Sequence, residues 1–257
     1  MCRLILAHGT FLARDILSAA LAMSQGLTAT GEGPTRCHPN GWGAVWRDLE
    51  SGRLVTHRDE RTICQDALPR GLDTDTLAVH VRHATLARTR GREFTHPLNR
   101  GDAWQFMHNG FLPTVYRQLG LPASRFDSAE YFDYIVPRGS SSLDPGRTLR
   151  RLETLEPGGS SGNAIAMNAS HAYVIHWTFA DNAYPRYFTM HRYSTPSLVV
   201  VSSEVIPELA PPGQWEPLAP QSVIEIPISP IQKGTDADAH HHDRLGPRHG
   251  NRRRAAA

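Results

Sequence analysis

Apolar residues recur along the chain with two different periods. Residues 2–6 form a short, largely apolar run that is typical of a buried strand, and residues 12–23 place an apolar side chain at every third or fourth position, as one face of a helix does. In residues 77–82 apolar residues alternate with other types, which predicts a further strand. Because successive side chains of a strand point to opposite faces, Arg82 is expected at the end of this core strand, on the face opposite Val79 and Val81.

The second half of the chain predicts helices among many short strands. Asp127 is a natural N-cap with Glu130 at the third helical position, and a second helix is expected after Asp144 and Pro145. Short extended segments are expected at residues 164–167, 172–177, 187–191, 198–203 and 223–228. Runs of strands with a few helices between them favour the α+β class over a parallel α/β sheet.

The apolar periodicity ends near residue 231. Residues 232–257 are polar, with three consecutive histidines and a terminal cluster of arginine and alanine. A segment of this composition buries too little apolar surface to offset the loss of chain entropy on folding. We therefore expect one domain, residues 1–231, followed by a disordered His- and Arg-rich tail, residues 232–257.

The composition argues against several classes of function. The formal net charge is +2, and the cluster Arg252, Arg253 and Arg254 lies in the tail, so the rest of the chain is nearly neutral and lacks a basic surface for nucleic acid. Cys2, Cys37 and Cys64 form no C-x-x-C pair, which disfavours a disulfide framework or a structural zinc site and favours a reducing compartment. No apolar run is long enough to span a membrane. We expect a cytoplasmic protein without nucleic-acid or membrane partners.

Cys2 has a property that no internal cysteine has. Once Met1 is removed, this residue carries both a thiol and a free α-amine, whose pKa of ~8 lies close to neutral pH. One residue can then supply the nucleophile and the base of an acyl-transfer reaction. Taken alone, Cys2 is also explained as a small, inert residue buried at the start of a strand.

Other positions could complete such a site. Asn109 and Gly110 could donate hydrogen bonds to an oxyanion, through a side-chain amide and a backbone N–H, although Asn-Gly is also the strongest short signal for a hairpin turn. Arg82 could bind a carboxylate and Asp127 an ammonium group, as the α-carbon end of glutamine requires. Taken singly, these two residues are equally explained by a surface ion pair and a helix N-cap.

These weak signals occur together, in an order and spacing that resemble the class II glutamine amidotransferases. The resemblance runs from Met1 to about Ile228, and seven motifs in register are specific where any one of them is common. The motifs are Met1-Cys2-Arg3, Asn40-Gly41-Trp42-Gly43, Arg82-His83-Ala84-Thr85, Thr95-His96-Pro97-Leu98, His108-Asn109-Gly110, Asp127-Ser128 and Ser203-Glu204. The fold that the resemblance implies is the Ntn-hydrolase sandwich, with two antiparallel sheets between two layers of helices.

The resemblance also implies a role for each matching residue. It assigns the catalytic roles to Cys2 as nucleophile, with its own α-amine as base, and to Asn109 and Gly110 as the oxyanion hole. It assigns the substrate's α-carboxylate to Arg82 and its α-ammonium to Asp127. The pocket is expected to be lined by Thr85 and His96. It implies no cofactor, and the histidines near this site show no ligand-pair spacing, so no metal is expected.

The chain departs from the family pattern at several positions. Asn40 replaces the usual acidic residue, Thr95 replaces a frequent asparagine, and Ala129 interrupts the Asp-Ser-Glu run. Residues 86–94 carry three arginines, which predicts either a solvated loop or a lid that prefers an acidic substrate or partner surface. These departures concern substrate contacts more than the nucleophile.

The sequence thus predicts a cysteine-nucleophile amidohydrolase that cleaves the γ-amide of glutamine or of a γ-glutamyl compound through a γ-glutamyl thioester. Two alternatives remain open. The chain could be a glutaminase subunit that passes ammonia to a separate synthetase, or a catalytically silent amidotransferase-like protein used for binding or regulation. A nucleophile at the mature terminus argues against the silent alternative.

Overall fold

The computed structural model describes residues 1–29, 33, 35–63 and 71–228. Cys64 and the predicted tail, residues 232–257, lie outside this part of the chain, as do residues 229–231 of the predicted domain. Within the described residues, the helices are all too short or too polar to cross a membrane.

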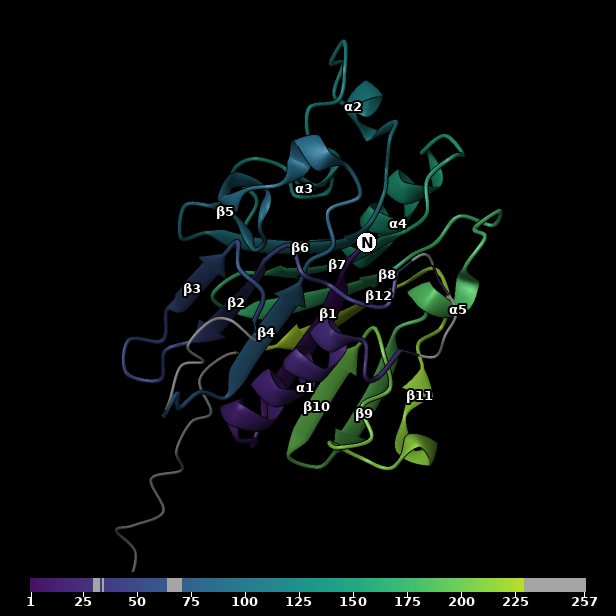
Figure 1. Cartoon of the computed structure of the whole chain (residues 1–257). Coiled ribbons are helices and arrows are strands. Elements are labelled where there is room, and N and C mark those ends of the chain that lie inside the picture. Colours follow the sequence, from purple (N-terminus) through teal and green to yellow (C-terminus); the bar gives the residue numbers. More distant parts are fainter. Residues whose placement is uncertain (30–32, 34, 64–70, 229–257) are drawn as a thin grey trace, which may run out of the picture.

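Two antiparallel sheets form the centre of the molecule (Figure 1). The seven-stranded sheet has the order β11 (Glu216–Pro217), β9 (His191–Thr195), β10 (Leu198–Ser202), β1 (Arg3–Gly9), β4 (Thr76–Val81), β2 (Trp42–Arg47) and β3 (Leu54–Asp59). The five-stranded sheet has the order β12 (Ser222–Pro227), β8 (His171–His176), β7 (Gly162–Met167), β6 (Trp104–Gly110) and β5 (Leu98–Arg100). The sheets pack face to face through a buried apolar layer that joins Leu4 and Leu6 of β1 to Met107 of β6 and Ile165 of β7.

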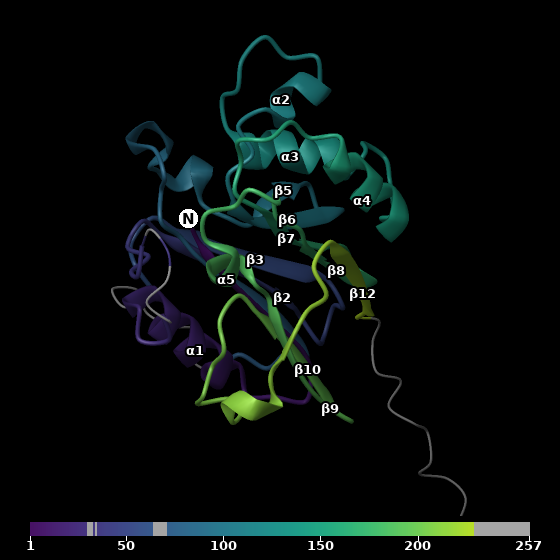
Figure 2. The ribbon, with the colours of Figure 1, turned by 90° about the vertical axis from the view of Figure 1, so that its right-hand side faces the viewer.

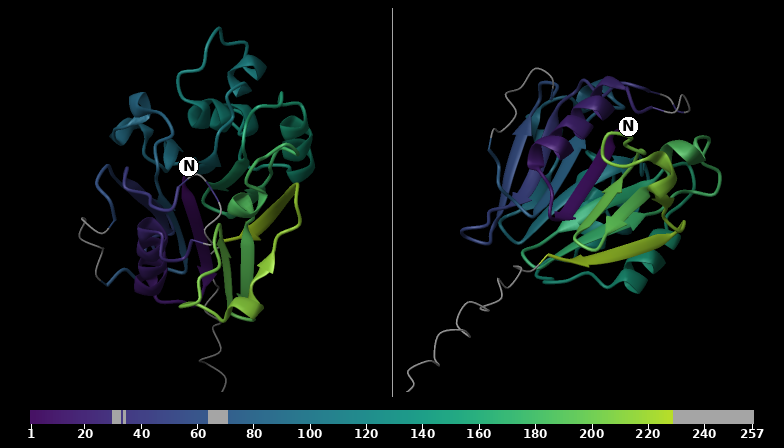
Figure 3. Two further views of the ribbon diagram at one scale, coloured as in Figure 1. Left: turned by 45° about the vertical axis from the view of Figure 1, so that its right-hand side comes forward. Right: turned by 90° about the horizontal axis from the view of Figure 1, so that it is seen from below.

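Helices cover the outer face of each sheet (Figure 2). Helix α1 (Ala13–Gln25) lies against the seven-stranded sheet, as Figure 3 also shows. It buries Ile16, Leu17 and Met23 there. The other sheet is covered by α2 (Val115–Gln118), α3 (Asp127–Ile135) and α4 (Pro145–Glu153). The layers therefore run helix, sheet, sheet, helix, which confirms the predicted α+β sandwich.

The strand that carries Arg82 follows the predicted alternation. Val79 and Val81 of β4 pack towards α1, whereas Ala78 packs between the two sheets. His80 and Arg82 lie on the same face as Ala78, because they follow it at intervals of two residues. Strand β1 pairs with β4 so that Arg3 lies opposite Val81, which brings the residue before Arg3 to the residue after Val81.

Two local predictions are wrong. The segment 187–191 is not extended: Pro185 begins the short helix α5 (Pro185–Phe188), in keeping with the preference of proline for a first helical position, and β9 starts only at His191. Helix α3 is not capped by Asp127, which is its first helical residue; Phe126 is the N-cap. The helix predicted after Asp144 and Pro145 is confirmed as α4, and the structure shows that the Asp144 carboxylate caps it by accepting the N–H of Arg147.

Candidate active site

The N-terminus lies where the ends of β1, β4 and β6 meet. Cys2 is buried, and its backbone N–H donates to Oδ1 of Asn109 at 2.9 Å. Because Cys2 precedes a strand of one sheet and Asn109 belongs to a strand of the other, this bond fixes the nucleophile candidate against the opposite sheet. The bond also orients the amide: Oδ1 is the acceptor, so Nδ2 remains as a buried donor, and it has no partner among the described residues.

Asn109 and Gly110 do not form a hairpin turn. Both residues belong to β6 and pair with Asn163 and Gly162 of β7. A side chain at position 110 would not fit, because a Cβ there would lie 1.8 Å from the carbonyl oxygen of Ser161. Glycine therefore allows the close approach of two backbones at this strand end.

The thiol of Cys2 lies in a strongly perturbed electrostatic environment. Burial raises the pKa of the Cys2 thiol, but in the chain that retains Met1 the electrostatic effects of His80, the Met1 amine and Arg82, with a hydrogen bond from His80, outweigh burial and lower this pKa to about 5. A thiolate is therefore the stable form at neutral pH, and the thiolate is the nucleophilic form of cysteine.

His80 was missed as a site residue by sequence reasoning. It precedes Arg82 by two residues, so the strand period alone places it on the same face as Arg82 and was the available signal. Its Nε2 lies 3.2 Å from the carbonyl oxygen of His108, and its ring packs on His96 with 4.3 Å between centroids. Burial, followed by the charges of His80 and Arg82, lowers the pKa of His96 well below its usual range, so His96 is a neutral wall of the pocket.

Arg82 is buried, yet its guanidinium is only partly satisfied. One nitrogen, Nη2, donates to the carbonyl oxygen of Thr89 at 2.6 Å, whereas Nη1 is buried and has no partner among the described residues. Asn40 holds the chain at this point: its N–H donates to the carbonyl of Arg82, and its Oδ1 accepts the N–H of Ala84, both at 2.9 Å. The backbone and side chain of Asn40 thus fix the chain on both sides of His83.

Asp127 approaches from the helix that covers the five-stranded sheet. Its carboxylate accepts the backbone N–H of Leu112 at 2.9 Å. The N–H groups of Ala129 and Glu130, which an N-cap side chain at position 127 would bind, donate instead to the carbonyl oxygen of Phe126, so Asp127 does not have the predicted capping role.

Met1 occupies the rim of the same site. Its amine donates to the carbonyl oxygen of His83 at 2.7 Å and to the hydroxyl of Thr85 at 3.3 Å. Removal of Met1 would transfer the terminal amine to Cys2 and clear this part of the rim.

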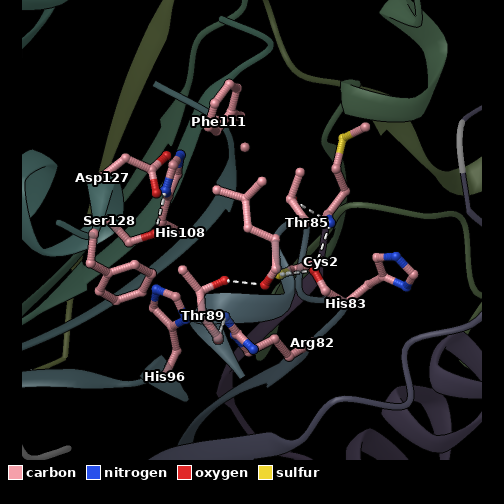
Figure 4. A pocket seen from close by; sticks show the side chains of 14 residues that line it. Cys2, Arg82, His83, Thr85, Thr89, His96, His108, Phe111, Asp127 and Ser128 are labelled. Carbon is pink, nitrogen blue, oxygen red and sulfur yellow. Dashed lines mark hydrogen bonds between the residues drawn. The ribbon is translucent and has the colours of Figure 1, made fainter. Parts of the chain in front are cut away.

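A pocket of about 430 Å³ collects the predicted residues (Figure 4). Its walls include Cys2, Arg82, Thr85, His96, Gly110 and Asp127. Asn109 is fully buried behind them and reaches the site through its bond to Cys2. The structure thus brings all seven predicted residues together, and their chemical roles stay predictions. Residues to which the sequence analysis assigned no role in the site complete the lining, namely Met1, His83, Leu86, Thr89, His108, Phe111, Phe126 and Ser128.

A buried ion pair supports the start of β1. The guanidinium of Arg3 lies 2.7 Å from the carboxylate of Glu204 and 3.6 Å above the ring of Tyr187. The hydroxyl of Ser203 accepts the N–H of Leu4 at 2.9 Å. The Ser203-Glu204 motif therefore anchors the strand that carries the nucleophile candidate and does not line the pocket.

Solved structures share this fold. A structure described as the allosteric regulatory enzyme of purine biosynthesis has 16% sequence identity and a TM-score of 0.60, and the match covers 89% of this chain and 49% of that one. Glutamine phosphoribosylpyrophosphate amidotransferase from B. subtilis, complexed with ADP and GMP, has 18% identity and a TM-score of 0.56 over the same shares. A glutamine aminotransferase class-II domain protein from Silicibacter pomeroyi has 16% identity and a TM-score of 0.54, with 89% of this chain and 100% of that chain covered.

The chain spans about half the length of the first two of these proteins. No protein-family model and no curated protein match the chain. At these identities the comparisons establish the fold, which is the Ntn-hydrolase sandwich that the resemblance to class II glutamine amidotransferases implies. Within the described residues, there is no group of three or more His, Cys, Asp or Glu side chains that could hold a metal ion.

Proposed function

We propose that the protein is an amidohydrolase that uses Cys2, freed by removal of Met1, to cleave the γ-amide of glutamine or of a γ-glutamyl compound. One observation carries the proposal. The hydrogen bond from the Cys2 N–H to Asn109 leaves the Asn109 Nδ2 as a buried donor without an acceptor, directly beside the nucleophile. A buried donor without a partner lowers the stability of the fold. Such a donor is expected at a site where a bound substrate supplies the missing acceptor.

Two side chains of the pocket match the two charged groups on the α-carbon of a glutamyl substrate. The unpartnered Nη1 of Arg82 suits a carboxylate, and the carboxylate of Asp127 suits an ammonium group. This arrangement directs the opposite end of a glutamyl group, its γ-carbonyl, towards the thiol. Thr85 and His96 complete the walls between these two ends.

The reaction follows from these positions. The Cys2 sulfur attacks the γ-carbonyl carbon, and the oxyanion that forms is stabilised by the Asn109 Nδ2 and the Gly110 N–H. The proton of the thiol resides on the α-amine of Cys2, which gives it to the leaving nitrogen as the C–N bond breaks. Water then cleaves the γ-glutamyl thioester, which releases glutamate and regenerates the Cys2 thiol. No step needs a metal or an organic cofactor.

The direct test is turnover by matched variants. Intact mass establishes whether Met1 is absent, and release of ammonia or amine is then measured with glutamine and a panel of γ-glutamyl amides. We expect Cys2→Ala to lose at least about 1000-fold in kcat. Cys37→Ala, which removes an exposed cysteine, is the matched control and should keep wild-type activity. Equal activity in Cys2→Ala would refute the assigned nucleophile.

The alternatives give different outcomes in the same assay. A glutaminase subunit for a separate synthetase would turn over glutamine slowly alone and faster with its partner. A silent binding protein would retain Met1 and release no amine from any γ-glutamyl amide.

A further inference from the structure

A second pocket adjoins the proposed active site. It has a volume of about 410 Å³ and lies between the 86–94 loop, with the short turns η1 (Ala87–Thr89) and η2 (Arg92–Phe94), and the segment that enters α3. The two pockets share five lining residues: Leu86, Thr89, Phe111, Phe126 and Asp127. Since Asp127 borders both, a ligand held at Asp127 is positioned to reach either pocket.

Two arginines line this second pocket from separate elements. Arg88 comes from η1 and Arg125 from the segment before α3. Both residues are exposed, and within the described residues neither guanidinium takes part in an ion pair or a side-chain hydrogen bond. Their charges are therefore available to a ligand.

Two acidic side chains close to the second pocket, Glu130 and Asp127, already accept hydrogen bonds from other residues. Glu130 is buried and accepts the N–H of Arg125 at 2.7 Å and the hydroxyl of Ser124 at 2.7 Å. Asp127 accepts the N–H of Leu112. The lining of the pocket thus carries two positive groups against one negative group, and the negative group is the one that we assign to the substrate's ammonium.

We propose that this pocket is a subsite for a second anionic group of the substrate. It rests on the proposed function, which places the glutamyl group between Cys2 and Asp127. The preferred substrates are then glutamyl amides that carry a carboxylate or a comparable anion beyond the glutamyl group, bound between Arg88 and Arg125. Guanidinium groups bind carboxylates in a bidentate geometry, which gives selectivity over a neutral amide of the same shape.

The test measures binding rather than turnover. Cys2→Ala is titrated by calorimetry with two isosteric pairs: γ-glutamyl-glycine against γ-glutamyl-glycinamide, and glutaminyl-glycine against glutaminyl-glycinamide. The first pair places the additional carboxylate on the amine side of the γ-amide, and the second pair places it beyond the α-carboxyl. We expect the anionic member of at least one pair to bind at least about tenfold more tightly than its neutral isostere.

Matched variants assign this preference to the pocket. Arg88→Gln with Arg125→Gln, both in the Cys2→Ala protein, should abolish the preference for the anionic peptide. Arg90→Gln removes an exposed arginine of the same loop that lines neither pocket, and it should keep the preference. Equal binding within both pairs, loss of preference in Arg90→Gln alone, or no binding of any of the four peptides would overturn the subsite. A different result would show that the proposed function itself is wrong: full amidohydrolase activity in Cys2→Ala, or no turnover by the wild type.

Discussion

The backbone N–H of Cys2 and the side-chain oxygen of Asn109 lie 2.9 Å apart, and their hydrogen bond joins the two sheets at the reactive end of the chain. It lets one asparagine do two things. Its oxygen holds the backbone of Cys2, and its nitrogen remains a buried donor without a partner among the described residues, which our proposal assigns to the oxyanion. The two functions can be separated by substitution.

Asn109→Asp keeps the oxygen that accepts from Cys2 and replaces the Nδ2 donor by a second oxygen. We expect kcat to fall by about 100- to 1000-fold, the cost of one oxyanion donor, while the fold is retained. Steady-state kinetics and circular dichroism on the same preparation measure both effects. Wild-type kcat in this variant would remove Asn109 from the oxyanion hole.

The lowered pKa of Cys2 predicts a thiolate over most of the pH range. Because the folded-state pKa is about 5, the thiolate persists as the pH falls towards 5 and is lost only below it. The measurement is thiolate absorbance against pH in protein that retains Met1 and whose other two cysteines are replaced by serine. His80→Gln should raise the midpoint, whereas His8→Gln, at the far end of β1, should not. A midpoint of about 8.5 in the parent protein, as in an ordinary thiol, would contradict this electrostatic account.

Gly110→Ala should be poorly tolerated, because its Cβ would overlap the carbonyl oxygen of Ser161. We expect a loss of at least about 2 kcal/mol in the free energy of unfolding, since backbone must move to make room. Gly213→Ala is the control, because a Cβ there meets open space. Denaturant unfolding of the two variants gives the comparison, and equal stability would show that the 110–161 contact is looser than described.

The Arg3–Glu204 pair predicts a contrast between buried and exposed ion pairs. Glu204→Gln leaves the buried guanidinium of Arg3 without its counter-charge and should cost about 3–5 kcal/mol in the free energy of unfolding. Asp102→Asn breaks the exposed pair with Arg53 and should cost less than about 1 kcal/mol. Urea titration measures the free energy of unfolding of both variants. A small loss of similar size in the two would mean that the Arg3 guanidinium is adequately solvated without Glu204.

The sequence predicted most of what depends on local pattern. The strand that delivers Arg82 and helix α1 follow from apolar periodicity, the start of α4 follows from Pro145, and the strand-rich second half indicated the α+β class. The convergence of Cys2, Asn109 and Arg82 was predicted from the family resemblance alone, because contacts between residues 107 positions apart leave no local pattern.

Other features depend on tertiary packing and escaped prediction. Strands β3 and β5 have little apolar pattern of their own: β3 forms by pairing with the buried strand β2, and the three-residue β5 by pairing with the seven-residue β6. The cap of α3 was misassigned because Glu130 bonds to the backbone before the helix and Asp127 bonds to Leu112, a partner from another segment. The reason for glycine at position 110 is likewise a contact with β7 that only the folded chain reveals.

The central claim is the proposal that Cys2 attacks the γ-carbonyl carbon of a glutamyl group. It is tested most directly by mass spectrometry of the protein after incubation with the diazoketone analogue of glutamine, with the modified residue mapped by peptide sequencing. The account predicts one adduct for each chain, on a Cys2 that has lost Met1, abolished in Cys2→Ala and retained in Cys37→Ala. An unmodified Cys2, or an adduct located on another residue, would contradict it.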